Sequence, residues 1–357
     1  MRINNKLKLA AFAFLNCLAG QSLADTSLKI YGQGHLSYDR VDDGINTHSL
    51  VASSSSRLGV TMVHPISDSL EVLFQIESGV DLTGEGTNDG NGPSNSNGQI
   101  FTKGRPSFVG LRGNMGTVLI GHMPALDEWA NDYNHFADQV GDLGNLWEAS
   151  GIPGRLDDVI YYKTPDLAGA TVAVTYAPDQ SANDDDILIV NAEMGWDNFY
   201  LTTAYTQIGQ GTVSNDDHTG LAVLLSYNVG GASIGVGYQS EQDIQGIAGN
   251  DRDSYTIGAS YPIGKKGKIK AQYAISESDT ADSDAEQFAI GYDYSLDANN
   301  VIYIAVAFMD NDNNVAFSVN GKGHGDKITP QVGEDMTAVS IGIVSKFDAS
   351  LDKLLKL

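Results

Sequence analysis

The chain has almost no cysteine, a small share of basic residues and, beyond its first 24 residues, no long apolar run. Cys17 is its one cysteine and lies near the N-terminus, so the rest of the chain has neither disulfide nor thiol chemistry. No stretch of about 18 apolar residues follows the N-terminal segment, which excludes a membrane protein built from helices. Lys and Arg number 21 against 45 Asp and Glu. So acidic a chain is not expected to bind nucleic acid.

The N-terminus has the pattern of a secretory signal. Arg2, Lys6 and Lys8 precede an apolar core at residues 9–20, and Ser22-Leu23-Ala24 follows it. The pattern predicts a signal peptide over residues 1–24 that is removed after Ala24. Its removal leaves 18 basic and 45 acidic residues, a formal charge of about −27. Most of these acids are expected on solvated loops.

From residue 28 to residue 347 the chain consists of segments about ten residues long in which apolar and polar residues alternate. The last segment, residues 336–347, places Val339, Ile341, Ile343 and Phe347 on one face. Such alternation predicts strands with one apolar face and one wet face. A soluble sandwich explains a few of them. Sixteen, joined alternately by tight turns and long loops, predict an all-β fold, an antiparallel transmembrane β-barrel over residues 25–347.

Three segments depart from this alternation. Residues 41–52 lie between the first two expected strands, residues 28–40 and 53–64. Residues 82–103 form a long loop rich in Gly, Asn and Ser, and residues 124–155 form the longest irregular stretch. The latter contains Trp129, Tyr133, Phe136 and Trp147. A structureless loop of this length is usually functional, and its aromatic residues need a surface to pack on. It is expected to pack on the inner wall. Residues 348–357 are expected to be a tail, either unstructured or a short amphipathic helix.

Several local motifs in this order resemble the Gram-negative general diffusion porins, which are trimeric sixteen-stranded barrels. The motifs are Ile30-Tyr31-Gly32, Ser56-Arg57-Leu58-Gly59, Phe74-Gln75-Ile76-Glu77-Ser78-Gly79, Arg105-Pro106-Ser107-Phe108-Val109-Gly110-Leu111, Gly116-Thr117-Val118, Arg155 with Asp158 and Tyr161, and the final Phe347. The resemblance covers nearly the whole chain after the signal. It implies that residues 124–155 fold into the barrel as a constriction loop.

The same resemblance implies a basic wall that faces acids on the constriction loop. By motif, Arg57, Arg105 and Arg155 match the basic wall. The alternation of β-strand side chains supports Arg57 independently, because Leu58 and Val60 point the other way. The facing acids are expected to be Asp132, Asp138 and Asp142, with solvated loop charge as the alternative.

Alternation also places Gln33, His35, Glu71, Gln75 and Glu77 on the lumen side. Two departures weaken the basic wall. Gln33 stands where many relatives have a basic residue, and Leu119 and His122 stand where arginines often follow the Gly-Thr-Val turn.

These features predict an outer-membrane porin, a water-filled channel for passive diffusion of small hydrophilic solutes and ions. Positive and negative charge balance at the constriction while the approaches are acidic, so weak cation selectivity is expected. The resemblance also implies a homotrimer in contact with outer-membrane lipid and lipopolysaccharide. Residues 82–103 would latch onto a neighbour, and Phe347 would be the signal read by the barrel-assembly machinery.

The residues indicate no enzyme, cofactor or metal site. The seven histidines have no metal-ligand spacing, and the Gly-rich stretch at residues 84–98 lacks the lysine and helix of a phosphate-binding loop. The alternatives are a substrate-specific outer-membrane channel, a barrel enzyme of the phospholipase or protease type, and a secreted β-sandwich or adhesin.

Overall fold

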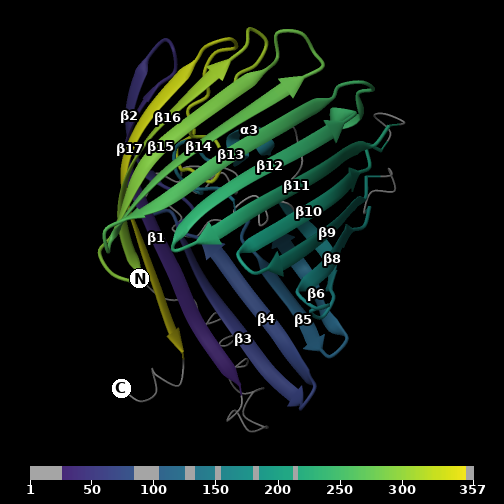
Figure 1. The fold of residues 1–357 in the computed structure, drawn as a ribbon. Helices are drawn as coiled ribbons and strands as arrows, with labels where there is room; N and C mark the ends of the chain where they lie inside the picture. The colour runs from purple at the N-terminus through teal and green to yellow at the C-terminus, as the bar shows by residue number, and fades with distance from the viewer. Residues whose placement is uncertain are drawn as a thin grey trace, which may run out of the picture.

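A computed structural model describes residues 26–83, 104–124, 133–148, 154–179, 185–211 and 216–350. Most of these residues belong to one antiparallel sheet that closes on itself (Figure 1). The expected signal peptide, residues 1–24, and most of the expected latch at residues 82–103 lie outside the described residues. None of the described helices is long and apolar enough to cross a membrane.

The described part of the chain contains seventeen strands and two short helical turns. The turns are α3 (Gly144–Trp147) and η2 (Ile244–Gly246). The strands are β1 (Ser27–Asp42), β2 (Thr47–Ser53), β3 (Arg57–Ser67), β4 (Leu70–Gly79), β5 (Ser107–Gly113), β6 (Gly116–Pro124), β7 (Arg155–Lys163), β8 (Ala170–Ala177), β9 (Ile187–Trp196), β10 (Phe199–Ile208), β11 (His218–Val229), β12 (Ala232–Gln242), β13 (Arg252–Ile263), β14 (Gly267–Ser278), β15 (Ala285–Ser295), β16 (Asn300–Asn311) and β17 (Met336–Ser350).

The seventeen described strands occupy sixteen positions around the barrel, because β2 and β3 share one position. Both pair with β1, β2 along its second half and β3 along its first half. They are separated by Ser54, Ser55 and Ser56, and Ser55 has a left-handed φ of 49°. The expected sixteen-stranded barrel is therefore confirmed, and residues 41–52, which lie between the first two expected strands, contain most of β2.

Pairing between the first and last strands closes the barrel. β1 pairs with β17 from Lys29 opposite Ser350 to Asp42 opposite Thr337. A closed sheet leaves no strand edge unpaired, which is the condition for β-structure in hydrocarbon. β17 runs three residues past Phe347, and Lys29 Nζ lies 3.1 Å from Asp348 Oδ2. The expectation that a tail starts at residue 348 is wrong for residues 348–350, because these residues still have β1 as a partner.

Side chains alternate between a buried inner face and an exposed outer face, as the sequence pattern predicts. On β17, Ala338 and Ser340 are fully buried, whereas Val339, Ile341 and Ile343 are exposed by 38%, 58% and 42%. Ile290 and Tyr292 on β15 are also exposed. Exposed apolar side chains around the outside of a closed barrel form a lipid-facing belt.

Phe347 lies on this outer face above Gly32. A Cβ at Gly32 would lie 2.5 Å from the Phe347 ring, so the ring covers the space that glycine leaves open between paired strands. Its proposed role in assembly stays a prediction.

Candidate functional site: a constriction inside the barrel

The described part of the constriction loop, residues 133–148, lies inside the barrel and is held there by apolar side chains. Phe136, Val140, Leu143, Leu146 and Trp147 are at most 1% exposed. They pack with inward residues of the wall such as Ala289 and Ala305. The aromatic and apolar residues of this acidic segment are thus the side chains that pack against the barrel wall. α3, a single turn, is visible behind β13 in Figure 1.

Three glutamines on the inner wall also bind the backbone of the constriction loop. Gln287 on β15 donates through Nε2 to the carbonyl oxygens of Gly141 and Asp142, at 3.0 and 2.9 Å. Gln239 on β12 donates to the carbonyl of Trp147 at 2.9 Å, and Gln272 on β14 accepts from the backbone N–H of His135 at 3.0 Å. A loop without regular structure leaves backbone groups unpaired, and the wall amides satisfy them.

A buried lysine provides a further anchor. Lys270 Nζ on β14 lies 2.9 Å from Asp293 Oδ1, donates to Gln139 Oε1 at 2.9 Å and sits 4.7 Å above the Phe136 ring. A buried cation requires such partners. Lys270 therefore links two wall strands to the loop.

Asp142 folds the constriction loop rather than simply lining the lumen. Its carboxylate accepts from Asn134 Nδ2 at 2.6 Å and from the backbone N–H groups of Gly144 and Asp138, at 2.8 and 2.7 Å. Burial, and then the charge of Asp138, raise the pKa of Asp142 to about 7, against these hydrogen bonds, which favour the ionised form. Near neutral pH Asp142 contributes less negative charge than a free carboxylate.

The three predicted arginines lie close together in the lumen. Arg57 donates to the carbonyl of Ser55 at 3.3 Å and to Gln33 Oε1 at 3.4 Å. Arg105, just before β5, is buried, and its Nη1 lies 3.7 Å from Glu77 Oε1. Burial and the nearby charges of Arg155 and Arg57 lower the pKa of the Arg105 guanidinium. The three charges thus act on one another within one cluster.

The arginine cluster and the constriction loop line one cavity of about 440 Å³. Arg57, Arg105 and Arg155 line it together with Asp138 and Asp142. Asp132 lies outside the described residues. Three charged lining residues were not among the predicted site residues: Glu148, Lys322 and Lys346. The alternation of β17 would have identified Lys346, which has the opposite parity to Phe347.

The other predicted lumen residues divide between the cavity and its approaches. Gln33 and His35 line the cavity. Glu77 lies beside it and accepts from the Tyr31 hydroxyl at 2.7 Å. Glu71 forms an ion pair with Arg112 beside a tight turn, and Gln75 contacts the carbonyl of Pro106 at 3.5 Å.

Besides Gln33, the other two positions that depart from the family pattern have roles outside the cavity. Leu119 is buried in the core, and His122 lies 2.7 Å from Asp157. Within the described ranges, no group of three or more His, Cys, Asp or Glu side chains could hold a metal ion.

A closed barrel with an apolar outer belt and a charged lumen narrowed by an inward loop is a transmembrane diffusion channel. The chain matches the family described as Gram-negative porin over residues 9–314. It therefore belongs to the Gram-negative porin family, whose members are channels of the outer membrane and not enzymes.

Individual relatives agree with this assignment. The chain is 27% identical to outer membrane porin protein 32 of Delftia acidovorans, with 96% of this chain and 100% of that protein covered. An outer membrane porin protein of Bordetella pertussis is 25% identical over the same shares.

Among solved structures, an anion-selective porin from Comamonas acidovorans has a TM-score of 0.77 at 24% identity, with 90% of this chain and all of that one covered. The trimer form of OmpT from Vibrio cholerae has a TM-score of 0.68 at 18% identity, with 90% of this chain and 99% of that one covered. Both show the shared fold.

Proposed function

We propose that this porin is a non-specific channel for passive diffusion of small hydrophilic solutes and ions, and that its ion preference changes with salt. The observation that carries the proposal is the cavity between the arginine cluster and the constriction loop, where charges of both signs face each other. A pore lined in this way holds water and selects chiefly by size and charge.

The charges of the lining favour anions more than sequence alone suggests. Five basic side chains line the cavity (Arg57, Arg105, Arg155, Lys322 and Lys346) against three acids (Asp138, Asp142 and Glu148). Burial raises the pKa of Asp142, which reduces its negative charge near neutral pH, and the charges of Glu148 and Lys322 offset each other in an ion pair. The positive charges therefore outnumber the negative ones at the narrow section.

The entrance to the pore on the side of the longer connections between strands is negatively charged, in contrast to the narrow section. Connections between the strands on that side carry Asp43, Asp243, Asp251, Asp279, Asp282, Asp284, Asp312 and Asp335. At low salt their field reaches into the vestibule and concentrates cations. Salt screens exposed charges beyond roughly 8 Å at 0.15 M and roughly 3 Å at 1 M. We therefore expect weak cation preference at low salt that moves towards anions as salt rises.

Planar-bilayer reversal potentials in potassium chloride gradients, at low and high mean concentration, test this proposal. The double variant Arg57→Ala with Arg105→Ala should pass larger currents and move the reversal potential towards cations at both concentrations. Arg112→Ala is the matched control, because Arg112 lies outside the cavity and beside a tight turn. A wild-type preference for anions that is strong and independent of salt would contradict the proposed balance.

A homotrimer in contact with outer-membrane lipid and lipopolysaccharide is part of the same proposal, as is recognition of Phe347 by the barrel-assembly machinery. The trimer form of the Vibrio cholerae neighbour supports the oligomeric state. The mass of the native particle in detergent checks it, and a monomer at every concentration would refute it. For Phe347, an alanine substitution should lower surface levels, whereas deletion of residues 351–357 should leave them unchanged.

A further inference from the structure

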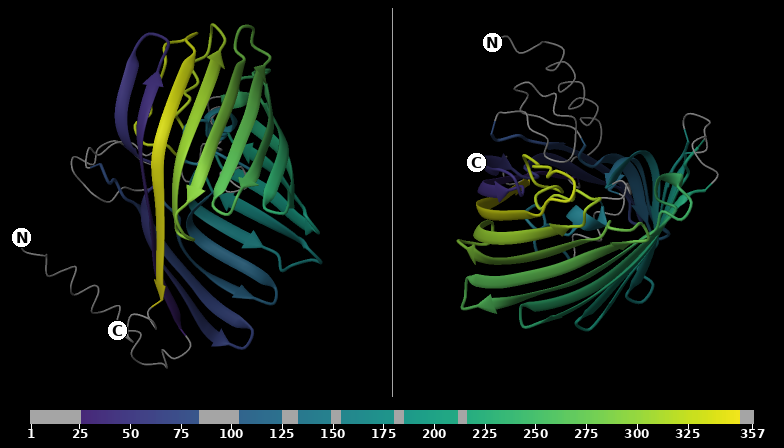
Figure 2. Two further views of the ribbon diagram at one scale, coloured as in Figure 1. Left: turned by 60° about the vertical axis from the view of Figure 1, so that its left-hand side comes forward. Right: turned by 90° about the horizontal axis from the view of Figure 1, so that it is seen from above.

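A second segment folds into the lumen, although its sequence predicts an ordinary surface loop between the last two strands. We call residues 315–328, between β16 and β17, the inner strap. Val319, Asn320 and His324 are fully buried, and Ser318 is 4% exposed. Figure 2 shows this yellow-coloured connection lying within the ring of strands when the barrel is seen from above. Polar side chains buried in this way have specific partners.

The inner strap lies directly on the constriction loop. Asn145 Oδ1 accepts from the backbone N–H groups of Gly321 and Lys322, at 2.9 and 2.8 Å. Asn145 Nδ2 and the Gly141 N–H both donate to the carbonyl of Val319, at 3.0 and 2.9 Å. Lys322 also forms an ion pair with Glu148. The strap and the loop therefore share one hydrogen-bond network.

The other side of the inner strap is held at the break between β2 and β3. Ser54 Oγ accepts from the Gly325 N–H at 3.1 Å, and Ser55 Oγ donates to the Gly323 carbonyl at 3.1 Å. A Cβ at Gly325 would lie 2.6 Å from the Ser53 carbonyl oxygen, so only glycine allows this approach. The serines that interrupt the strand are thus the docking site of the strap.

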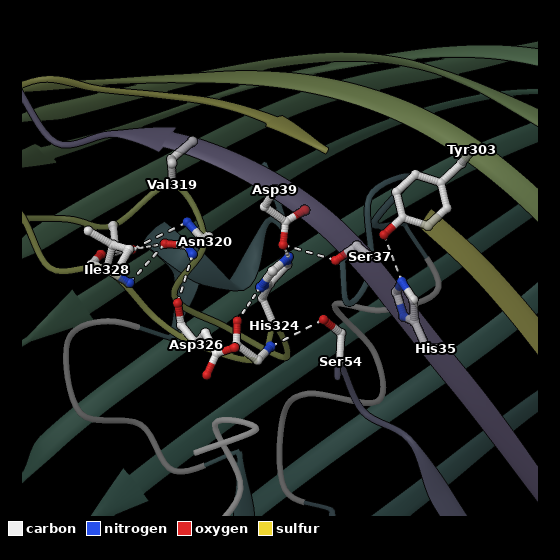
Figure 3. Close-up of polar contacts among 12 residues, drawn as sticks. His35, Ser37, Asp39, Ser54, Tyr303, Val319, Asn320, His324, Asp326 and Ile328 are labelled. Carbon is white, nitrogen blue, oxygen red and sulfur yellow. Dashed lines mark hydrogen bonds and ion pairs between the residues drawn. The ribbon is translucent and has the colours of Figure 1, made fainter. Parts of the chain in front are cut away.

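His324 joins the inner strap to β1, as Figure 3 shows. Its Nδ1 lies 2.5 Å from the Gly325 carbonyl oxygen and its Nε2 lies 3.2 Å from Asp39 Oδ2. Ser37 Oγ donates to the same carboxylate at 2.9 Å. Both ring nitrogens face oxygen atoms, which the doubly protonated imidazolium satisfies.

The docking site is continuous with the basic side of the pore. Arg57 follows the serines directly and donates to the Ser55 carbonyl, while Ser55 Oγ binds the strap. Lys322, near the middle of the inner strap, lines the same cavity as Arg57. The strap therefore both adds a charge to the narrow section and holds the backbone from which Arg57 projects.

We propose that the inner strap is a second constriction element, that Lys322 is a specificity-determining residue favouring small anions, and that His324 and Gly325 are positioning residues. The inference rests on the proposed function, since it concerns the solutes that the channel passes. Without the docked strap the pore is wider and prefers cations more.

Two pairs of variants test the inference in single-channel and reversal-potential recordings. Gly325→Val prevents docking by sterics alone and should raise conductance roughly 1.5- to 2-fold, because a wider section carries more ions. Val332→Ala, at an exposed site of the same connection, is its control. Lys322→Gln should move the reversal potential towards cations, whereas Lys327→Gln removes an equal charge from an exposed site outside the cavity and should not.

The outcomes separate this inference from the proposed function. If Gly325→Val fails to form barrels, replacement of residues 318–328 by a Gly-Ser linker tests the same rise in conductance. Wild-type conductance in the undocked variants, or equal shifts for Lys322→Gln and Lys327→Gln, would overturn the inference. A wild-type protein that conducts no ions in the bilayer would instead overturn the proposed function.

Discussion

The constriction loop and the inner strap lie in the same lumen but are held there by different interactions. The constriction loop buries large apolar side chains, including Phe136, Leu146 and Trp147, against the wall. The strap is held mainly by hydrogen bonds and by the His324–Asp39 contact. Apolar burial involves no titrating group, whereas the contact between His324 and Asp39 weakens when His324 loses its proton. The comparison indicates a fixed narrowing covered by an adjustable one.

The largest expected effect comes from removing an apolar anchor of the constriction loop. Trp147 packs over Gly237, where a Cβ would lie 2.8 Å from its ring. Trp147→Ala should lower the free energy of unfolding in urea by about 3–5 kcal/mol. It should also make single-channel currents larger and noisier, because the constriction loop loses the apolar contact that holds it against the wall. Trp196→Ala is the matched control, since Trp196 is exposed on the outer face. If the currents of Trp147→Ala had the same size and noise as those of the wild type, the constriction loop would not be held by apolar packing.

The next effect concerns the polar interior of the constriction loop. Asp142→Ala removes the acceptor of three hydrogen bonds, each of which stabilises the fold by about 1 kcal/mol. The three donors are then left without a partner inside the protein. We expect increased conductance and faster proteolysis within the loop. Asp142→Asn retains one carbonyl oxygen and should give an intermediate result. If the two variants behave alike, the carboxylate does not organise the loop.

A pH titration, run on the wild type and on a His324 variant, tests the contribution of His324 to the docked strap. Burial lowers the pKa of His324, but the hydrogen bond and charge of Asp39 outweigh it and raise the pKa above its ordinary 6.5. A raised pKa means that protonation favours the docked strap below pH 6.5 and that this contribution is lost as pH rises through the docked value. Conductance should therefore step upward as pH rises above 6.5 and through the raised pKa of His324.

The groups that face His324 are Asp39 and His35 on β1 and Asp326 within the strap. His324→Asn removes the titrating group, so its conductance should be raised and should lack the step. The same step in His324→Asn would assign it to another group.

The smallest effect is the coupling between the two segments. Lys322 forms an ion pair with Glu148; the Lys322 side chain is 28% exposed and the Glu148 side chain 7%. A double-mutant cycle of Lys322→Gln and Glu148→Gln should give a coupling of about 0.5–1 kcal/mol in unfolding free energy. A coupling near zero would mean that the segments meet without this pair stabilising them.

Part of the site could be read from the sequence because it lies on strands. Arg57, Gln33 and His35 follow the two-residue alternation, and that rule alone places them in the lumen. Glu71 obeys the same rule but lies beside a tight turn, away from the cavity. Alternation predicts the face of the sheet on which a residue lies, but not its position along the barrel axis. The anchors Gln239, Gln272 and Gln287 have inward parity, yet nothing local shows that they bind a loop.

The sequence by itself determined the barrel wall, its lipid-facing belt and the presence of a packed loop after β6. Each of these depends on the local pattern of apolar and polar residues. Only the tertiary structure decided that the β16–β17 connection also turns inward, that Asp142 serves the loop's own fold, and that Lys322 joins the arginines. The physical reason is separation along the chain: Asn145 binds Gln287, 142 residues away, and Gly325 binds Ser54, 271 residues away. Such contacts exist only once the barrel has closed.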